Sequence, residues 1–501
     1  MRACRNSVRP LAMGALLVCL LSAPAPGEEP SGAVAAPPDT LTLPECLVLA
    51  YRNNLDHRID RATLAASRER LRAARAPFEA NVNADLTLPS YSERRNVIDN
   101  EALLARIRQE DTRLDYEGRV SLSQRFRNIG EFSLIGSGFR NDFSSNRRQD
   151  FREYSADLSL AYEQEILTDP EEELQLRTTQ LSYAAGLSTL QRQRVQLESR
   201  VVNVYYDLVQ GVRQLEIQKQ RLDQSQAALE LARRKFEIGL IAEVEALRLE
   251  VDELRAQAEY AEAATRIESR RDALRQVLAM DVETPLAVST RVDFTILAVD
   301  EETAVAVAMV RRTDMEQQRL RQRIAHLDLK RTAQSMGPSA SLSARVNLTG
   351  RGPDPHDVGR TLERSLISAN IRVGLPLVDG GRRRGVVRQA EIDLEQRELT
   401  AEQVRQQVVL EVREAVRSVQ EAERQIRLLN SALEVAERTF EVEQSRFELG
   451  LANSQELLDA QTDLTQARTS ALNAVVSYQR ALQDLRLATM AEPKELVAGD
   501  G

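Results

Sequence analysis

The chain has 501 residues, enough for two or more domains with sizeable cores. It contains no Trp, 29% of its residues are charged, and long runs are rich in Ala, Leu, Glu, Gln and Arg, which is typical of extended helices and coiled coils. Acidic and basic residues are interleaved around a net charge of −9, so no basic patch predicts binding to nucleic acid.

The motifs of common enzymes are missing from the sequence. His57, His326 and His356 are scattered and do not pair with Cys or carboxylates at metal-ligand spacing. Neither G-x-S-x-G nor H-E-x-x-H occurs. We therefore expect no enzymatic activity, no catalytic residue, no metal site and no cofactor.

The N-terminal segment has the pattern of a secretory signal peptide. Arg2, Arg5 and Arg9 precede an apolar run from Leu11 to Leu21, and Ala25-Pro26-Gly27 offers a cleavage site. The pattern predicts a signal peptide over 1–27, followed by a linker over 28–40. After it, no apolar run approaches the roughly 20 residues of a spanning helix. The exported protein is then either soluble outside the cytoplasm or inserted in a membrane as β-structure.

A first helix is predicted over 41–76, with Thr42 as its cap and Pro44 in its first turn. Cys46 lies on this helix, and we expect it to be a small buried apolar residue. Much longer helices follow over about 172–238 and 386–449, where apolar residues recur at steps of three, four and seven. This period of 3.5 predicts coiled-coil packing, and at 1.5 Å per residue each helix is about 100 Å long.

The chain repeats itself. The segment KFEIGLIAEVEAL starts at Lys235, and RFELGLANSQELL starts at Arg446, at an offset of 211 positions that also aligns the apolar residues upstream. We interpret the sequence as a tandem duplication, with a first repeat over 41–281, a linker over 282–300, a second repeat over 301–490 and a tail over 491–501.

The shorter helices are long enough to stack end to end beside the long ones. In the first repeat these are 41–76 and the helix that returns after Gly239 to about Met280. In the second repeat they are 301–335 and 453–490. The sequence therefore predicts four columns of helix per chain, two continuous and two broken.

Between the helices the apolar period switches from 3.5 to two. Alternating residues mark strands in ANVNADLTL, EYSADLSLAY, SASLSARVNL and LISANIRVGLPL, which begin at Ala80, Glu153, Ser339 and Leu366. Each is long enough to cross a bilayer as a tilted strand, and a soluble β-domain on a coiled coil is the alternative. Because a membrane barrel must close and has at least about eight strands, four strands per chain demand an oligomer, most simply a trimer of twelve strands.

A further hairpin is predicted over 116–143, from YEGRVSLSQRF and EFSLIGSGFRNDF. It either extends the barrel or stands above it as an external loop, and the sequence does not choose between the two.

These features together resemble the TolC-type outer membrane efflux proteins. The resemblance rests on the tandem α–β–α repeat, the two F-E-x-G-L turns, the phrase GLPLVDGGRRRG at Gly374–Gly385 and the opening LTLPECLVLAYRNNLD at Leu41–Asp56. It covers about 41–490. The fold that it implies is mainly α with a membrane β-barrel, shared by a homotrimer in the outer membrane, and a periplasmic α-helical tunnel.

The resemblance also implies a function. Such a protein is the passive exit duct of a tripartite efflux or type I secretion system, and its partners are outer membrane lipid, a periplasmic adaptor and an inner-membrane pump. The alternative is a periplasmic coiled-coil adaptor or scaffold. An adaptor normally has one helical hairpin within a lipoyl-like domain, whereas this chain duplicates the whole helical unit.

The resemblance also implies which residues form the tunnel entrance. Gly239-Leu240 and Gly450-Leu451 match the helical turns at which an adaptor docks. Glu456 and Asp459 match a pair of inward-facing acids, and their i, i+3 spacing puts both on one helix face. Threefold symmetry would make each a ring of three carboxylates that favours cations.

Glu245 matches an acid that helps to hold the closed state. Its expected basic partner falls on Ala452, and the neighbouring aromatic position holds Phe447 rather than Tyr. The polar lock of other members is therefore not expected here.

The phrase GLPLVDGGRRRG predicts a strand end followed by a sharp turn into the next long helix. Gly374 and Pro376 mark the strand end, and Gly380 and Gly381 allow the change of direction. A barrel wall that continues into a helical tunnel needs such a break.

Overall fold

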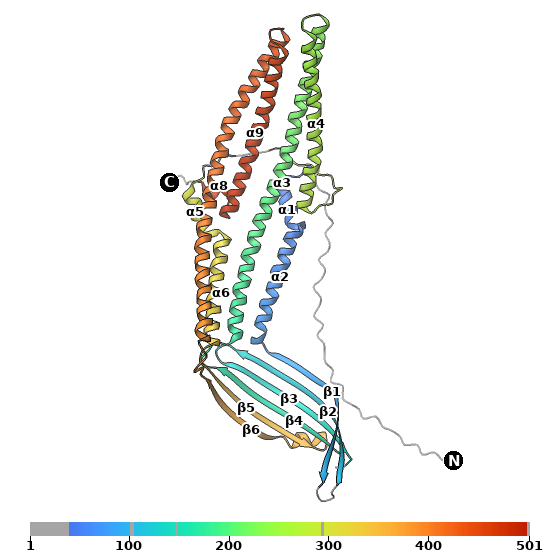
Figure 1. Ribbon diagram of the computed structural model, residues 1–501, viewed down its shortest axis with the longest axis vertical. Helices are drawn as coiled ribbons and strands as arrows, with labels where there is room; N and C mark the ends of the chain where they lie inside the picture. Colours follow the sequence, from blue (N-terminus) through green and yellow to red (C-terminus); the bar gives the residue numbers. More distant parts are fainter. Residues whose placement is uncertain (1–39, 101–104, 147–148, 292–294, 498–501) are drawn as a thin grey trace, which may run out of the picture.

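The computed structural model describes residues 40–100, 105–146, 149–291 and 295–497. The predicted signal peptide and nearly all of the linker over 28–40 lie outside the described residues. The chain is a long bundle of helices with one β-sheet at one end (Figure 1).

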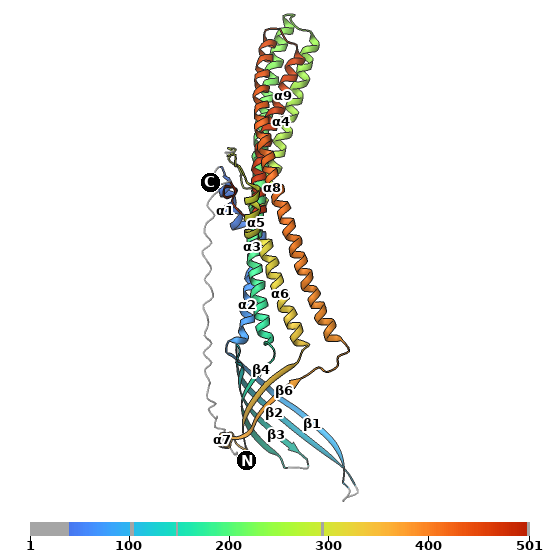
Figure 2. The same cartoon turned by 90° about the vertical axis from the view of Figure 1, so that its left-hand side faces the viewer.

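Two continuous helices run the length of the bundle. Helices α3 (Glu171–Glu237) and α8 (Arg382–Glu448) have 67 residues each, which makes each about 100 Å long. Two pairs of shorter helices flank them. Helices α2 (Leu55–Arg75) and α4 (Glu243–Leu278) lie along α3, and α6 (Thr313–Ser335) and α9 (Ser454–Thr489) lie along α8 (Figures 1 and 2). The predicted four columns, two continuous and two broken, are confirmed.

The columns have a fixed lateral order. Helix α3 contacts α6 and α9 as well as α2 and α4, whereas α8 contacts α6 and α9. The order across the chain is therefore α8, then α6 with α9, then α3, then α2 with α4. This order leaves α8 at one lateral edge and α2 with α4 at the other.

The predicted helices over 41–76 and 301–335 are each interrupted once, which corrects the sequence prediction. Helix α1 (Leu43–Asn53) ends before α2 because the side-chain oxygen of Asn54 accepts a hydrogen bond from the His57 backbone N–H at 3.0 Å, capping α2. In the second half α5 (Glu301–Arg311) stops before α6 at Arg312, whose backbone is likewise extended. The cap at Thr42 is as predicted, with a capping box to Glu45.

Six antiparallel strands form the sheet, in the order in which they occur in the chain. They are β1 (Asn81–Asn100), β2 (Ala105–Phe126), β3 (Gly130–Ser145), β4 (Phe151–Glu165), β5 (Ser339–Gly352) and β6 (Glu363–Gly374). A short helix, α7 (Pro355–Arg360), joins β5 to β6, and short 3₁₀ turns lie at Ala76–Phe78 and Pro493–Leu496. The predicted hairpin over 116–143 is β2–β3 and lies inside the sheet, so the count of four strands per chain is wrong.

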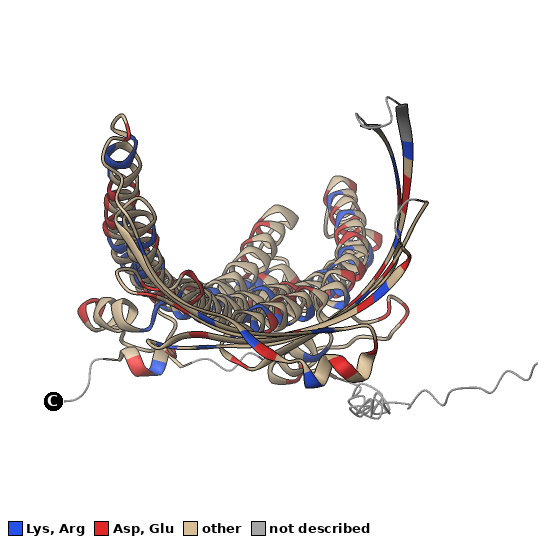
Figure 3. Cartoon of the chain, turned by 90° about the horizontal axis from the view of Figure 1, so that it is seen from below, with Lys and Arg blue, Asp and Glu red and all other residues tan. Residues whose placement is uncertain are grey.

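The two faces of the sheet differ in polarity. One register row crosses all six strands with apolar side chains only: Val82, Leu122, Leu134, Leu160, Val346 and Ile367. A row on the opposite face holds Asn81, Ser123, Ser133, Ala161, Arg345 and Ser368. The sheet and the helices curve in the same sense and form an open arc (Figure 3).

Three apolar cores hold the helices together. Two lie near mid-height, one around α1, α3 and α4, and the other around α5, α8 and α9. Cys46 belongs to the first and is fully buried, as predicted, and burial raises the pKa of its thiol to about 12. The third core lies near the helical turns and draws residues from α3, α4, α8 and α9.

Candidate functional site at the helical turns

The two duplicated turns have the same backbone geometry. Gly239 and Gly450 adopt left-handed φ angles of 77° and 75° directly after α3 and α8. The Leu240 N–H donates to the Lys235 carbonyl at 2.9 Å, and the Leu451 N–H donates to the Arg446 carbonyl at 2.8 Å. This is the Schellman termination, for which glycine is favoured because a Cβ is strained at this φ.

Exposed apolar side chains surround both turns. Ile238 and Leu240 are 71% and 69% exposed, and their counterparts Leu449 and Leu451 are 75% and 68% exposed. Large apolar groups on the tip of a helical hairpin are unusual for a surface that faces only water.

The acids predicted for the entrance lie close together on α9. Glu456 and Asp459 are both exposed on the first turns of that helix. Glu456 has a structural task that the sequence analysis missed, because its carboxylate accepts from the Asn453 N–H at 3.2 Å while the Asn453 side chain accepts from the Glu456 N–H at 3.0 Å. This capping box starts α9. The N-x-x-E spacing of Asn453 and Glu456 in the sequence is the signal that predicts this capping box. Asp459 accepts from Gln455 at 2.8 Å.

The first turn lacks this arrangement. Helix α4 begins after Ala242, which has no side chain to cap it, and Glu245 is half-buried on its first turn. Glu245 makes no ion pair with any of the described residues, and Ala452, at the position of the expected basic partner, is half-buried. Glu245 therefore lies on a different helix from Glu456 and Asp459, and no basic side chain among the described residues pairs with it.

A lysine links the two hairpins instead. Lys235, near the end of α3, is 6% exposed, its Nζ donates to the backbone carbonyl of Phe447, and it lies 4.4 Å from the centroid of the Phe447 ring. The carbonyl belongs to the last turn of α8, where the helix dipole favours a cation. Lysine is seldom buried without a carboxylate. Its pairing with Phe447 could not be read from the sequence, because the two residues come from different repeats.

Packing below the turns makes the two hairpins one unit. Leu229, Ala232 and Leu249 from the first hairpin share a core with Phe440 and Leu464 from the second. Arg221 on α3 is mostly buried and pairs with Asp252 at 3.2 Å and Glu259 at 2.6 Å on α4. The tips of the two hairpins are thus packed against each other within one chain.

The segment from the end of β6 to the start of α8 contains the four residues assigned to the strand-to-helix break. Strand β6 ends at Gly374, and Gly380 and Gly381 adopt left-handed φ angles of 63° and 87° before α8. The Asp379 carboxylate accepts from the N–H groups of Gly381 at 3.0 Å and Arg383 at 2.7 Å. These backbone donors, that of Arg383 first, hold the pKa of Asp379 below its ordinary value.

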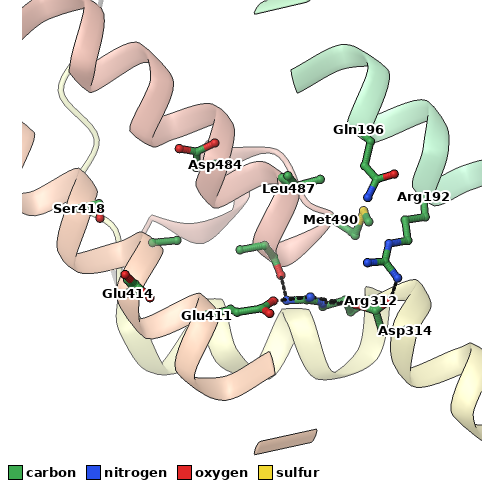
Figure 4. Close-up of a pocket in the computed structure, with 12 residues that line it drawn as sticks. Arg192, Gln196, Arg312, Asp314, Glu411, Glu414, Ser418, Asp484, Leu487 and Met490 are labelled. Atoms are coloured by element: carbon green, nitrogen blue, oxygen red, sulfur yellow. Dashed lines mark hydrogen bonds and ion pairs between the residues drawn. The ribbon is translucent and has the colours of Figure 1, made fainter. Parts of the chain in front are cut away.

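A polar network crosses the bundle at mid-height (Figure 4). Arg312, at the α5–α6 break, pairs with Glu411 on α8, with Asp314 at 2.9 Å, and with the Ala488 carbonyl at 3.3 Å. Arg192 on α3 completes the chain of contacts by pairing with Asp314. These side chains line a cavity of about 430 Å³. The network ties α3 and α8 to the broken column between them, at the height where that column changes helix.

Among the described residues, no three His, Cys, Asp or Glu side chains are grouped so as to hold a metal ion. No helix in the described part of the chain is long and apolar enough to cross a membrane.

Comparisons with known proteins agree with the fold. A model of the outer membrane efflux protein family matches residues 305–489. No curated protein matches the chain. Among solved structures, a membrane protein from Pseudomonas aeruginosa is 18% identical with a TM-score of 0.66, and the alignment covers 93% of this chain and 96% of that one.

Two further solved structures are named as channels. The CmeC outer membrane channel of Campylobacter jejuni is 15% identical with a TM-score of 0.67, covering 89% of this chain and 85% of that one. The MtrE outer membrane channel of Neisseria gonorrhoeae, in its open state, is 14% identical with a TM-score of 0.65, covering 91% of each chain. Residues 305–489 thus match the outer membrane efflux protein family, and over most of its length the chain has the same fold as these solved structures.

Proposed function

We propose that this protein is the outer membrane channel of a tripartite efflux or type I secretion system, a passive exit duct formed by three copies of the chain. The observation that carries the proposal is that one chain has the form of a segment of a tube wall. Sheet and helices share one curvature (Figure 3), and the wall has an open edge on each side.

The helical edges support pairing with further copies. On α4, Val244, Leu247, Val251 and Leu254 form a stripe with steps of three and four. On α8 and at its C-cap, apolar residues recur every seven positions at Leu428, Val435, Val442 and Leu449. All eight side chains are between 49% and 75% exposed in the single chain. Stripes of this period are coiled-coil seams, and they lie on the two helices that end the wall on opposite sides.

The sheet edges lie on the same two sides. Strand β1 follows α2, and strand β6 precedes α8, and each has one neighbouring strand within the described residues. A sheet with one wholly apolar row suits lipid only if such edges are closed, because open edges leave backbone groups unpaired in hydrocarbon. Joining β1 of one copy to β6 of the next closes both the sheet and the helical wall.

The turns supply the remaining parts of the proposal. The exposed Leu240 and Leu451 side chains form an apolar surface for a periplasmic adaptor, which delivers substrate from an inner-membrane pump. Glu456 and Asp459 form rings of carboxylates that favour cations at the entrance. The gate is held by the Lys235–Phe447 contact rather than by an ion pair of Glu245.

Fractionation tests the proposal against the adaptor alternative. We expect the protein in the outer membrane fraction as trimers that resist SDS until heated, and we expect the purified trimer to conduct ions in planar bilayers. A monomer recovered from the soluble periplasmic fraction would overturn the channel and favour an adaptor or scaffold.

A further inference from the structure

The β2–β3 hairpin lies in the middle of the sheet. Strand β2 pairs with β1 along nearly the whole of β1, and β3 pairs with β4 from Glu131–Glu163 to Phe143–Phe151. Strands β1 and β4 are therefore separated by two strands and are not neighbours.

The hairpin carries the same apolar face as the strands around it. Leu122 on β2 and Leu134 on β3 continue the row from Val82 to Leu160. They are 41% and 40% exposed, close to the 51% of Leu160. A hairpin that stood in water above a barrel would not need apolar residues on alternate positions, aligned with the apolar residues of β4.

Aromatic residues bound the apolar face at both ends, including on the hairpin. At the end near the helices, the Phe132 ring lies 4.8 Å from Tyr162 and 5.9 Å from Phe126. At the far end, the Arg140 guanidinium lies 5.1 Å from the Tyr116 ring and 5.9 Å from the Tyr154 ring. Such residues mark the two interfaces of a membrane barrel.

The height of this apolar zone on β2 suits a bilayer. Tyr116 and Phe126 lie ten residues apart on the same face. At about 3.3 Å per residue and a tilt of about 40°, they are about 25 Å apart along the membrane normal, the height of the apolar band of outer membrane barrels. Beyond Tyr116 and the following pair of Leu114 with Tyr91, the same face becomes charged, with Arg95 paired to Glu93 at 2.7 Å and to Glu110 at 3.5 Å.

The widths of sheet and bundle agree only when the hairpin is counted. Six strands spaced about 4.8 Å apart and tilted about 40° span about 38 Å of wall, whereas four strands span about 25 Å. Four helical columns about 9 to 10 Å apart span about 36 to 40 Å. A six-stranded sheet therefore continues the helical wall without narrowing it.

From these observations we infer that β2 and β3 are membrane strands, so that three chains close an eighteen-stranded barrel with β1 of each copy paired to β6 of the next. The inference rests on the proposed trimeric channel. The barrel is about 36 Å across between backbone walls, against about 24 Å for twelve strands. Its bore is as wide as the helical tunnel, so bulky solutes that pass the entrance meet no second constriction in the membrane.

Cysteine accessibility tests the inference on the assembled trimer in liposomes, with Cys4, Cys19 and Cys46 replaced by Ala. Leu122→Cys and Ser121→Cys report on β2, and Leu160→Cys and Ser159→Cys are the matched pair on β4, which is a wall strand with or without the hairpin. With a membrane-impermeant maleimide, we expect Ser121→Cys to label like Ser159→Cys. We expect labelling of Leu122→Cys to be lost as for Leu160→Cys, and a lipid-borne quencher to reach a fluorophore at Leu122 as well as one at Leu160.

Two results separate the possible failures. If both β2 cysteines label freely while the β4 pair differs, the hairpin is outside the wall and the eighteen-stranded barrel is wrong, although the channel stands. If the β4 pair also labels freely on both faces, the proposed membrane channel itself fails.

A disulfide test gives an independent answer. Val82 and Leu160 lie three strands apart, about 14 Å, which is too far for a disulfide. We expect Val82→Cys with Leu160→Cys to stay reduced under oxidation, whereas Val82→Cys with Leu122→Cys, on paired strands, cross-links. Cross-linking of Val82 to Leu160 would show that β1 pairs with β4 and would overturn the inference.

Discussion

At the residue scale, Lys235 links two hairpins that belong to different sequence repeats. Its Nζ is buried between the Phe447 carbonyl and the Phe447 ring, so the contact joins the end of α3 to the end of α8. A desolvated cation over an aromatic ring contributes about 2 kcal/mol. Lys235 therefore links the ends of α3 and α8 in a chain that has Ala452 where the resemblance implies a basic residue.

In the proposed channel, replacing the charge of Lys235 should loosen the contact between the two turns. Lys235→Met keeps the length of the side chain and its contact with Phe447 but removes the cation, so we expect a severalfold rise in resting conductance in planar bilayers. Lys219→Met makes the same change at an exposed site on α3 and should leave conductance unaltered. Equal conductance of the Lys235 variant and the wild type would mean that the contact does not hold the gate.

The entrance acids can be tested without disturbing the helix that carries them. Glu456→Gln retains a capping box, since Gln also accepts from the N-cap N–H, while it removes the charge. We expect Glu456→Gln with Asp459→Asn to lower the cation-to-anion permeability ratio measured from reversal potentials. Glu434→Gln, an exposed acid on α8, serves as the control. An unchanged ratio would remove both acids from the entrance.

Glu198, near the middle of the bundle, makes the free energy of unfolding depend on pH. Its buried carboxylate accepts from the Tyr51 hydroxyl and lies 2.8 Å from Arg486, so it joins α1, α3 and α9. Burial raises its pKa above the ordinary value of 4.5, with Arg486 opposing the shift. Because the folded chain holds this proton more tightly than the unfolded chain, the stabilising contribution is complete below pH 4.5 and is lost as pH rises through the raised pKa.

We expect the melting temperature of the wild type, relative to Glu198→Gln, to fall as pH rises above about 4.5. Glu421→Gln is a control of opposite sign. The Arg424 side chain lowers the pKa of Glu421, so its contribution is present above the ordinary pKa and is lost as pH falls. A difference between wild type and Glu198→Gln that does not vary with pH would contradict the assignment.

At the element scale, local patterns predicted most helices and strands, and the failures have identifiable causes. The 3.5-residue period located α3 and α8, and alternation located the segments that became β1, β4, β5 and β6. The break at Arg312 was missed because Arg312 is held by contacts distant in sequence, among them the Ala488 carbonyl at 3.3 Å. The Asn54 cap on α2 is a local signal that was passed over, although the Asn54 amide also donates to the distant Val277 carbonyl at 2.8 Å.

The position of the β2–β3 hairpin shows a different limit. Its two strands were visible as alternating segments, but a strand's neighbours are set by pairing across the whole sheet rather than by its own sequence. The same holds for the candidate site, where the turns at Gly239 and Gly450 were located from the repeated sequence and the acids on α9 were assigned by resemblance. Lys235 was not found, because its partner lies on the other repeat.

The conformation of the turns can be tested by comparing the same substitution at a turn glycine and at a glycine within a helix. Gly450→Ala places a Cβ at a φ of 75° and should cost about 1 kcal/mol, because left-handed backbone is strained for alanine. Gly385→Ala makes the same change within α8, with no atom within 4 Å of the new Cβ, and should gain about 0.5 to 1 kcal/mol. Denaturation midpoints of the two variants should shift in opposite directions, and a shift of both in the same direction would exclude this account of the turn.

At the scale of the whole molecule, the chain is an incomplete wall whose two sides differ. One side presents α8 and β6, and the other presents α2, α4 and β1. Because the two sides differ, one side of a copy pairs with the other side of the next copy. Such head-to-tail association forms a ring when the rotation between neighbouring copies adds up to a full turn. The exposed heptad stripes on α4 and α8 then become buried seams between neighbouring copies.

Placing a charge in one seam should therefore prevent assembly while the single chain still folds. Val435 is 66% exposed on the α8 stripe, so Val435→Glu creates no buried charge within one chain but buries three charges in the closed ring. We expect SDS-resistant trimers to disappear and light scattering in detergent to report monomers with unchanged helical circular dichroism. Val310→Glu makes the same substitution at a 79% exposed site on α5, outside both stripes, and should leave the trimer intact. Trimers of normal stability in Val435→Glu would show that the α8 stripe is not a seam between copies.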